Sequence, residues 1–152
     1  DLPKGGFRDW IVTETRGKFP DLSQQIRSER CHHCEEAPCV GACPTGASHK
    51  SDGGTVLVDS DKCTGCKACI AACPYGARYV HPETGYVDKC TCCLHRVRRG
   101  EPTACEEVCP TSSLVLGDSN DAGSEVSRLL ATRRHKTLLP EEGLKPNLYF
   151  LE

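Results

Sequence analysis

The chain has 152 residues, a net charge of −2 and an isoelectric point near 6.3, so charge gives no case for nucleic-acid binding. Aromatic residues make up only 5 % of the chain and methionine is absent, whereas cysteine occurs 13 times. Such a composition predicts a thin apolar core that disulfides, metal or a partner surface must reinforce. No apolar run approaches the roughly 20 residues that span a bilayer, so membrane attachment would need another protein.

The residues before the first cysteine predict a loop and two short strands. Asp1–Gly6 is rich in proline and glycine, and Phe7–Thr15 and Gln24–Glu29 have strand-like composition on either side of Gly17–Ser23. We expect Trp10 to anchor the core. Because the chain lacks an initial methionine and any signal pattern, we also expect natural sequence before it.

The central cysteine run, Cys63–Pro74, has cysteines separated by two, two and three residues, with proline after the last. This is the bacterial-ferredoxin pattern that holds 4Fe–4S clusters through thiolates, and its fourth cysteine ligates the other cluster in two-cluster ferredoxins. The run therefore predicts a partner run elsewhere in the chain.

The partner run lies upstream, at Cys31–Ala47, with its second gap widened to four residues. We expect a helical turn at Val40–Ala42 that ends at Pro44. A short hairpin with a glycine-containing turn is predicted after each of the two runs. The predicted strand pairs are Ser48–Lys50 with Thr55–Asp59, and Arg78–Val80 with Tyr86–Val87.

A third, looser run begins at Cys90-Thr-Cys92-Cys93 and, after an eleven-residue insert, ends at Cys105–Pro110. Its end repeats the C-x3-C-P element of the other two runs. We expect a short strand after each C-P, the third at Ser113–Leu116. Three degenerate copies indicate an internal repeat.

The cysteines stop before Gly117, and a polar linker follows. Val126, Leu129 and Leu130 have helical spacing, so Ser124–Thr132 is predicted to be a helix, with Asp121 or Ser124 as N-cap. Leu138–Glu152 is predicted to be an extended tail that packs over a core or a partner. The expected fold class is α+β, with bacterial-ferredoxin-like repeats of short hairpins and short helices, organised as residues 1–30, 31–116 and 117–152.

The ferredoxin rule predicts how the cysteines share clusters. The first set is Cys31, Cys34, Cys39 and Cys73; the second is Cys63, Cys66, Cys69 and Cys43; the third is Cys90, Cys93 and Cys105. Cys109 should then serve a fourth cluster, whose own motif is absent from these residues. The fourth ligand of the third site is then Cys109, Cys92 or a cysteine before the first residue. A 3Fe–4S cluster or an incomplete site is a further alternative.

Other interpretations of the cysteines fit less well. The odd count and the spacing speak against disulfides, and zinc sites rarely use the triple C-x2-C-x2-C or the C-x3-C-P ending. A Rieske-type role for His32 and His33 is unnecessary because each four-cysteine set is complete. Cys92 is expected to be a small buried residue, since no His/Asn constellation accompanies it. With no catalytic residues evident, the chain is expected to carry electrons.

The motifs resemble those of the iron–sulfur subunits of molybdopterin oxidoreductases, of the polysulfide, dimethyl sulfoxide and tetrathionate reductase type. Cys31–Ala47, Cys63–Ala77 and Cys90–Pro110 are similar to that family's second, third and fourth motifs, and Lys145–Leu151 is similar to its closing segment. The same module occurs in alternative complex III. The family's first motif would lie before Asp1.

The resemblance implies a doubled ferredoxin fold and electron transfer through 4Fe–4S clusters. It also implies two partners: a molybdopterin-type catalytic subunit and an integral-membrane quinone-reactive subunit. The chain would then be a peripheral membrane subunit, and we favour the extracytoplasmic side. A soluble ferredoxin-like carrier and an iron–sulfur subunit of a formate dehydrogenase or hydrogenase are the alternatives.

Overall fold

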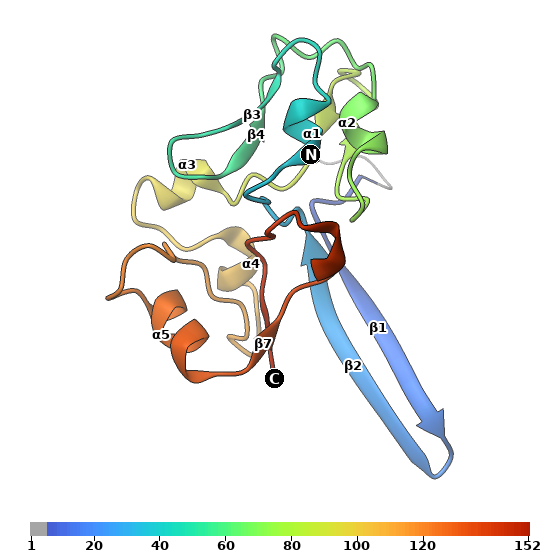
Figure 1. The fold of residues 1–152 in the computed structure, drawn as a ribbon, viewed down its shortest axis with the longest axis vertical. Coiled ribbons are helices and arrows are strands. Elements are labelled where there is room, and N and C mark those ends of the chain that lie inside the picture. The colour runs from blue at the N-terminus through green and yellow to red at the C-terminus, as the bar shows by residue number, and fades with distance from the viewer. Residues whose placement is uncertain (1–5) are drawn as a thin grey trace.

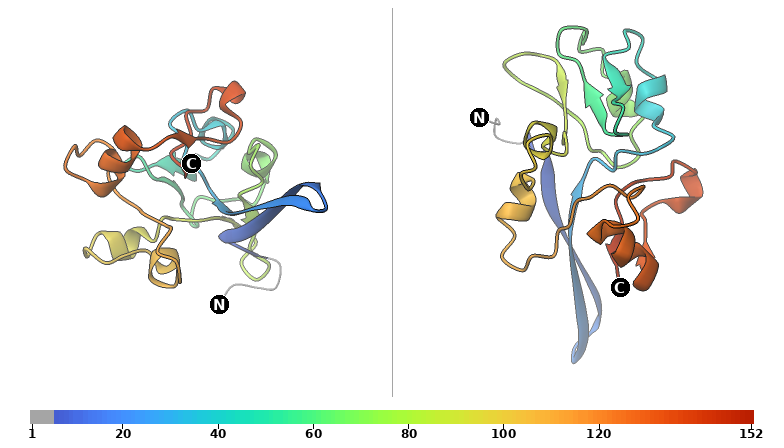
Figure 2. Two further views of the ribbon diagram at one scale, coloured as in Figure 1. Left: turned by 90° about the horizontal axis from the view of Figure 1, so that it is seen from below. Right: turned by 90° about the vertical axis from the view of Figure 1, so that its left-hand side faces the viewer.

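A long two-stranded hairpin projects from a body of short helices and strands in the computed structural model, which describes residues 6–152 (Figure 1). The loop predicted at Asp1–Gly6 therefore lies, except for Gly6, outside the described residues. The hairpin extends well beyond the body in both views of Figure 2. Its outer end thus stands apart from the other elements of residues 6–152.

The hairpin consists of β1 (Asp9–Lys18) and β2 (Asp21–Arg30), paired antiparallel from Asp9↔Arg30 to Lys18↔Asp21. It is longer than predicted, because only Phe19 and Pro20 connect the strands and a two-residue connection lets the ladder continue to the tip. The break expected at Gly17–Ser23 is therefore wrong. Trp10 is only half-buried on β1 and lies outside the core, so the prediction that it anchors the core is also wrong.

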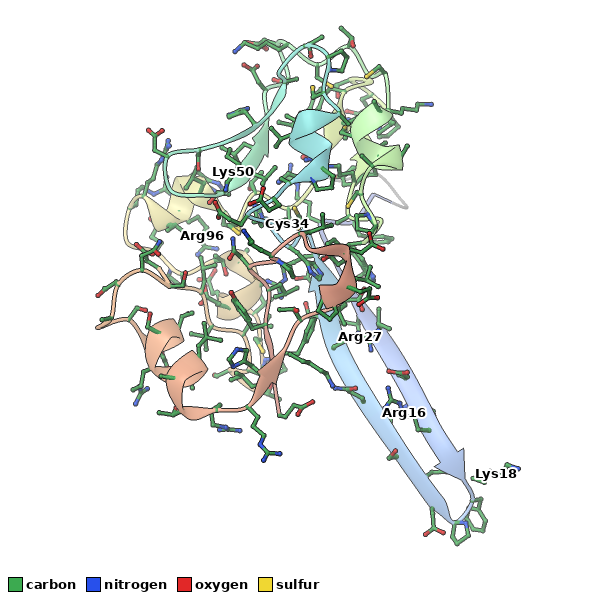
Figure 3. All side chains as sticks on the ribbon, viewed as in Figure 1. Arg16, Lys18, Arg27, Cys34, Lys50 and Arg96 are labelled. Carbon is green, nitrogen blue, oxygen red and sulfur yellow. The ribbon has the colours of Figure 1, made fainter. Side chains whose placement is uncertain are left out.

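The two faces of the hairpin differ because side chains alternate along a strand. One face carries ion pairs: Arg27 contacts Glu14 at 3.2 Å and Glu29 at 2.5 Å. The opposite face carries the exposed apolar residues Ile11 and Ile26. Figure 3 shows Arg16 and Lys18 on the outer part of this arm, far from the body.

The body starts with two similar halves, each made of a one-turn helix and a hairpin. In chain order their elements are α1 (Pro38–Gly41), β3 (Ser48–Lys50), β4 (Val56–Val58), α2 (Ala68–Ala71), β5 (Tyr79–Val80) and β6 (Val87–Asp88). β3 pairs with β4 and β5 pairs with β6, so both predicted hairpins form. β3 has the predicted bounds, β4 and β5 are shorter than predicted, and β6 is shifted by one residue. The core between the halves consists of Cys39, Val56, Cys69 and Val87.

The third copy of the repeat is incomplete. It contributes the one-turn helices α3 (Leu94–Val97) and α4 (Ala104–Glu107). The strand predicted at Ser113–Leu116 does not form, so that prediction is wrong. No following strand pairs with this segment among residues 6–152, and the Leu116 amide donates instead to the Glu106 carboxylate at 2.6 Å.

The C-terminal part contains one longer helix and a returning tail. α5 (Glu125–Thr132) is capped by Ser124, whose hydroxyl accepts from the Ser127 amide, as predicted. After a 3₁₀ turn at Pro140–Glu142, β8 (Phe150–Leu151) pairs with β7 (His135–Lys136). No helix among residues 6–152 combines the length and the apolar composition needed to cross a membrane.

All three copies share one backbone turn after the C-P element. The third residue after Cys43, Cys73 and Cys109 adopts positive φ and donates its amide to that cysteine's carbonyl. Two copies use glycine there, Gly46 (φ +67°) and Gly76 (φ +61°), whereas the third uses Ser112 (φ +48°). Glycine adopts this conformation without the steric cost that a Cβ imposes.

Replacing Ser112 by glycine is therefore expected to raise the free energy of unfolding by about 0.5–1 kcal/mol. The reciprocal substitution Gly76→Ser should lower it by about 1 kcal/mol, because a Cβ at Gly76 meets no atom of residues 6–152 within 4 Å and the positive φ is the source of the cost. Thermal unfolding of the cluster-loaded protein measures both. Equal destabilisation by the two substitutions would contradict this account.

Candidate metal centre

The first cysteine run forms one wall of a cavity, which we call site A. Cys31 and Cys34 follow the end of β2, and Cys39 is the second residue of α1. All three are buried. The fourth cysteine that lines the cavity is Cys73, which comes from the central run.

The four thiols of site A influence one another. Burial raises the pKa of the Cys34 thiol to about 11, and the negative charges of Cys31, Cys39 and Cys73 add to this rise. A thiolate bound to metal loses this penalty because the metal takes up the charge. Site A therefore favours a cationic metal group over four free thiols.

A second cavity, site B, is built in the same way from the other combination of runs. It is lined by Cys63, Cys66 and Cys69 of the central run and by Cys43 of the first run. Backbone amides point at its sulfurs: that of Ser48 lies 3.3 Å from Cys43 Sγ, and that of Val87 lies 3.4 Å from Cys63 Sγ. Cys66 is exposed, so site B is closer to solvent than site A.

The donor set of each cavity fits a metal–sulfur centre. All 13 cysteines are free, and four soft thiols converge on each site. Four thiolates suit zinc as well as a cubane cluster. The exchange of Cys43 and Cys73 between the two sites is the arrangement of two-cluster ferredoxins, and amide donation to the sulfurs is typical of iron–sulfur sites.

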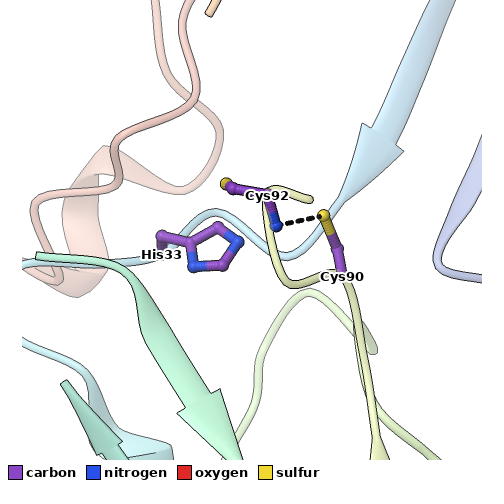
Figure 4. A group of neighbouring side chains, drawn as sticks. All are labelled: His33, Cys90 and Cys92. Carbon is purple, nitrogen blue, oxygen red and sulfur yellow. Dashed lines mark hydrogen bonds between the residues drawn. The ribbon is translucent and has the colours of Figure 1, made fainter. Parts of the chain in front are cut away.

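The third run is arranged differently. The groups that come closest are His33, Cys90 and Cys92, whose ligand atoms lie within 4.8 Å of one another (Figure 4). His33 Nδ1 accepts a hydrogen bond from the Val56 amide at 3.0 Å. In the neutral imidazole the proton is then on Nε2, which can donate to a thiolate but cannot bind a metal. His33 thus stabilises the segment around Cys90 and Cys92 through its hydrogen bonds and does not act as a metal ligand.

The other cysteines of the third run have separate polar neighbours. Cys105, on α4, accepts a hydrogen bond from Arg30 at 2.9 Å. Hydrogen bonds from Ser113 and Thr111 lower the pKa of the Cys109 thiol to about 6. In the Cys90–Cys92 pair, the hydrogen bond from Cys92 lowers the pKa of Cys90. The contacts of Cys109 and Cys90 favour the thiolate form that metals bind.

Polar and basic side chains also lie beside the thiols. His32 is buried, both of its ring nitrogens lack a hydrogen-bond partner among residues 6–152, and its ring stacks on Tyr75 at 3.8 Å. Burial lowers the pKa of His32 to about 4, so the imidazole is neutral at pH 7. Lys89 is almost completely buried and donates to the carbonyls of Val56 and Cys90. Only long-range packing brings these groups to the site.

The C-terminal tail closes over the first run. The carbonyl of Lys145 accepts from the Glu35 amide at 2.9 Å, and the Asn147 amide donates to the His32 carbonyl at 2.9 Å. The side chain of Asn147 donates to the His33 carbonyl, also at 2.9 Å. The tail therefore holds the loop that presents Cys31 and Cys34.

Comparison with known proteins adds chemical identity to this geometry. Residues 22–119 match the family of the 4Fe-4S dicluster domain. The chain is 44 % identical over 154 residues to protein NrfC of Escherichia coli K12, covering 97 % of this chain and 68 % of that protein. It is 43 % identical to the B component of polysulfide reductase from Wolinella succinogenes, covering 99 % of this chain and 80 % of that protein. It is 42 % identical to the B component of sulfite dehydrogenase from Allochromatium vinosum, covering 98 % of this chain and 65 % of that protein.

Replacing Asn147 by alanine should destabilise the cluster-loaded protein by about 1 kcal/mol, because the carbonyl of His33 loses its partner. Urea-induced loss of visible cluster absorbance measures the effect. Asn120→Ala is the matched control, since Asn120 is exposed in the polar linker. If both variants lose absorbance at the same urea concentration as the wild type, the tail does not hold the site.

Proposed function

Because this protein belongs to the 4Fe-4S dicluster family and is an iron–sulfur electron-transfer protein, we propose that it passes electrons between two other subunits of a redox complex. One is a molybdopterin-type catalytic subunit; the other is a quinone-reactive subunit in the membrane. The single observation that carries this proposal is the pair of adjacent four-cysteine cavities that exchange one ligand each.

We assign the ligands as follows. Site A holds one 4Fe–4S cluster through Cys31, Cys34, Cys39 and Cys73, and site B holds another through Cys43, Cys63, Cys66 and Cys69. A third cluster uses Cys90, Cys93 and Cys105, and Cys109 serves a further neighbouring cluster. When bound, the clusters supply one-electron chemistry; the protein positions them, neutralises their charge and excludes water.

The names of the relatives support a partner-dependent role. The polysulfide reductase and sulfite dehydrogenase relatives are components of larger enzymes by name, as is the B component of tetrathionate reductase from Salmonella typhimurium. We therefore propose that this chain is a peripheral subunit on the extracytoplasmic face of a membrane complex. Electrons would enter or leave through site B, where Cys66 reaches the surface.

Isolation of the tagged chain from its host membranes in mild detergent tests the assembly. We expect a molybdopterin-containing subunit and a membrane subunit to co-purify. Addition of a quinol or of the catalytic subunit's substrate should change the cluster EPR signals within the time of one catalytic turnover of the complex. Recovery of the chain alone from the soluble fraction, with clusters that do not respond to quinol, would favour a free carrier instead.

Single cysteine-to-serine variants test the ligand exchange. Cys43→Ser should alter the same EPR component as Cys66→Ser, and Cys73→Ser the same component as Cys34→Ser, because a serine ligand changes the spectrum of its own cluster. Cys92→Ser should leave iron and sulfide contents unchanged if the third cluster does not use Cys92, and a loss of iron would make Cys92 a ligand of that cluster. If Cys43→Ser instead altered the component that Cys34→Ser alters, the crossed ligand sets would be wrong.

A further inference from the structure

Arg78 is a buried cation without an acidic partner. The residue is 5 % exposed, and its Nη1 atom has no hydrogen-bond partner within residues 6–152. None of the ion pairs in this part of the chain includes it. A buried guanidinium is costly unless an anion or strong acceptors compensate it. The anion must therefore come from the thiolates around it.

The contacts of Arg78 reach both sites. Its Nη2 donates to Cys39 Sγ at 2.9 Å and to Ser48 Oγ at 2.9 Å. Arg78 and Cys39 line site A, whereas Ser48 lines site B. The backbone amide of Ser48 in turn donates to Cys43 Sγ, a proposed ligand of site B, at 3.3 Å. One guanidinium thus contacts a proposed ligand of site A directly and reaches a proposed ligand of site B through Ser48.

The internal repeat explains this position. Arg78 is the fifth residue after Cys73, and Ser48 is the fifth residue after Cys43, so the two are equivalent in the two halves of the body. Their side chains contact each other, which places them at the junction of the halves. Because one half carries arginine and the other serine, a single positive charge serves two cavities.

We propose that Arg78 is a shared tuning residue that raises the reduction potentials of the clusters in site A and site B together. This inference rests on the proposed ligand sets. Reduction places one further electron, and so one further negative charge, on a cluster that is already anionic. Cluster charge and hydrogen bonds to the sulfurs set the potential, and a fixed cation in a region of low dielectric stabilises the reduced form.

EPR-monitored redox titration of the cluster-loaded complex tests the proposal with four variants. Arg78→Gln removes the positive charge. Arg78→Lys keeps the charge but lacks the planar set of guanidinium N–H donors, and Ser48→Ala removes only the hydroxyl that accepts a hydrogen bond from Arg78. Lys62→Gln is the matched control, since Lys62 is solvent-exposed and pairs with Asp59 near site B. Iron and sulfide contents, measured first, report separately on the ligand sets.

In Arg78→Gln we expect the site A and site B components to shift together to lower potential, each by about tenfold in the equilibrium for reduction, or about 59 mV for one electron. Arg78→Lys and Ser48→Ala should shift both components in the same direction by less, and Lys62→Gln should shift neither. Site B is assigned through Cys66→Ser. If Arg78→Gln does not assemble clusters, the Arg78→Lys and Ser48→Ala titrations test whether the two components shift together to lower potential.

Unchanged potentials in a fully loaded Arg78→Gln protein would overturn the proposal and leave Arg78 a purely structural residue. A shift confined to one component would overturn the sharing between sites. Loss of stability with unchanged potentials would likewise count against it. By contrast, zinc in place of iron and sulfide in the wild-type protein would refute the proposed function itself, whatever the variants show.

Discussion

Mutual repulsion among buried thiolates is the constraint on which the rest of this structure depends. In site A, burial and three neighbouring thiols raise the pKa of Cys34 to about 11, so a cation beside this thiol favours its ionised form. Two of the four core residues, Cys39 and Cys69, also line site A and site B. The core of the body is therefore continuous with the walls of the two proposed metal sites, and removal of metal from them would remove much of what holds the halves together.

The sequence predicted those features that depend on local spacing. The helical turn predicted at Val40–Ala42 is present but begins and ends earlier, as α1 (Pro38–Gly41). The hairpin at Ser48–Lys50 and the Ser124 cap also follow from short-range patterns, and they are present. The cysteines that line each cavity are those that the exchange rule of two-cluster ferredoxins grouped, although their role as ligands stays a prediction. Repetition strengthened the inferences about the cysteine runs and the hairpins, because a pattern that occurs twice is rarely accidental.

Features that depend on distant partners could not be predicted. Ser113–Leu116 has strand composition but no complementary strand among residues 6–152, and a single strand gains no ladder of hydrogen bonds. Trp10 has the large apolar side chain of a core residue, yet the hairpin that carries it projects from the body. Arg78 and Lys89 become buried cations only once the hairpins fold against the cysteine runs. Composition gives no indication of which basic residues are enclosed and which are solvated.

The exchange of cysteines also has a consequence for the order of cofactor insertion. Along the chain, Cys43, Cys63, Cys66 and Cys69 all lie between Cys39 and Cys73, so the proposed ligands of site B are nested inside the loop that the proposed ligands of site A close. Filling site B first brings α1 and α2 together and leaves only a short segment for site A to close, which lowers its entropic cost. Filling site A first must close the whole loop at once. Maturation from the inside outward is the cheaper route, and the two clusters should therefore be acquired cooperatively rather than independently.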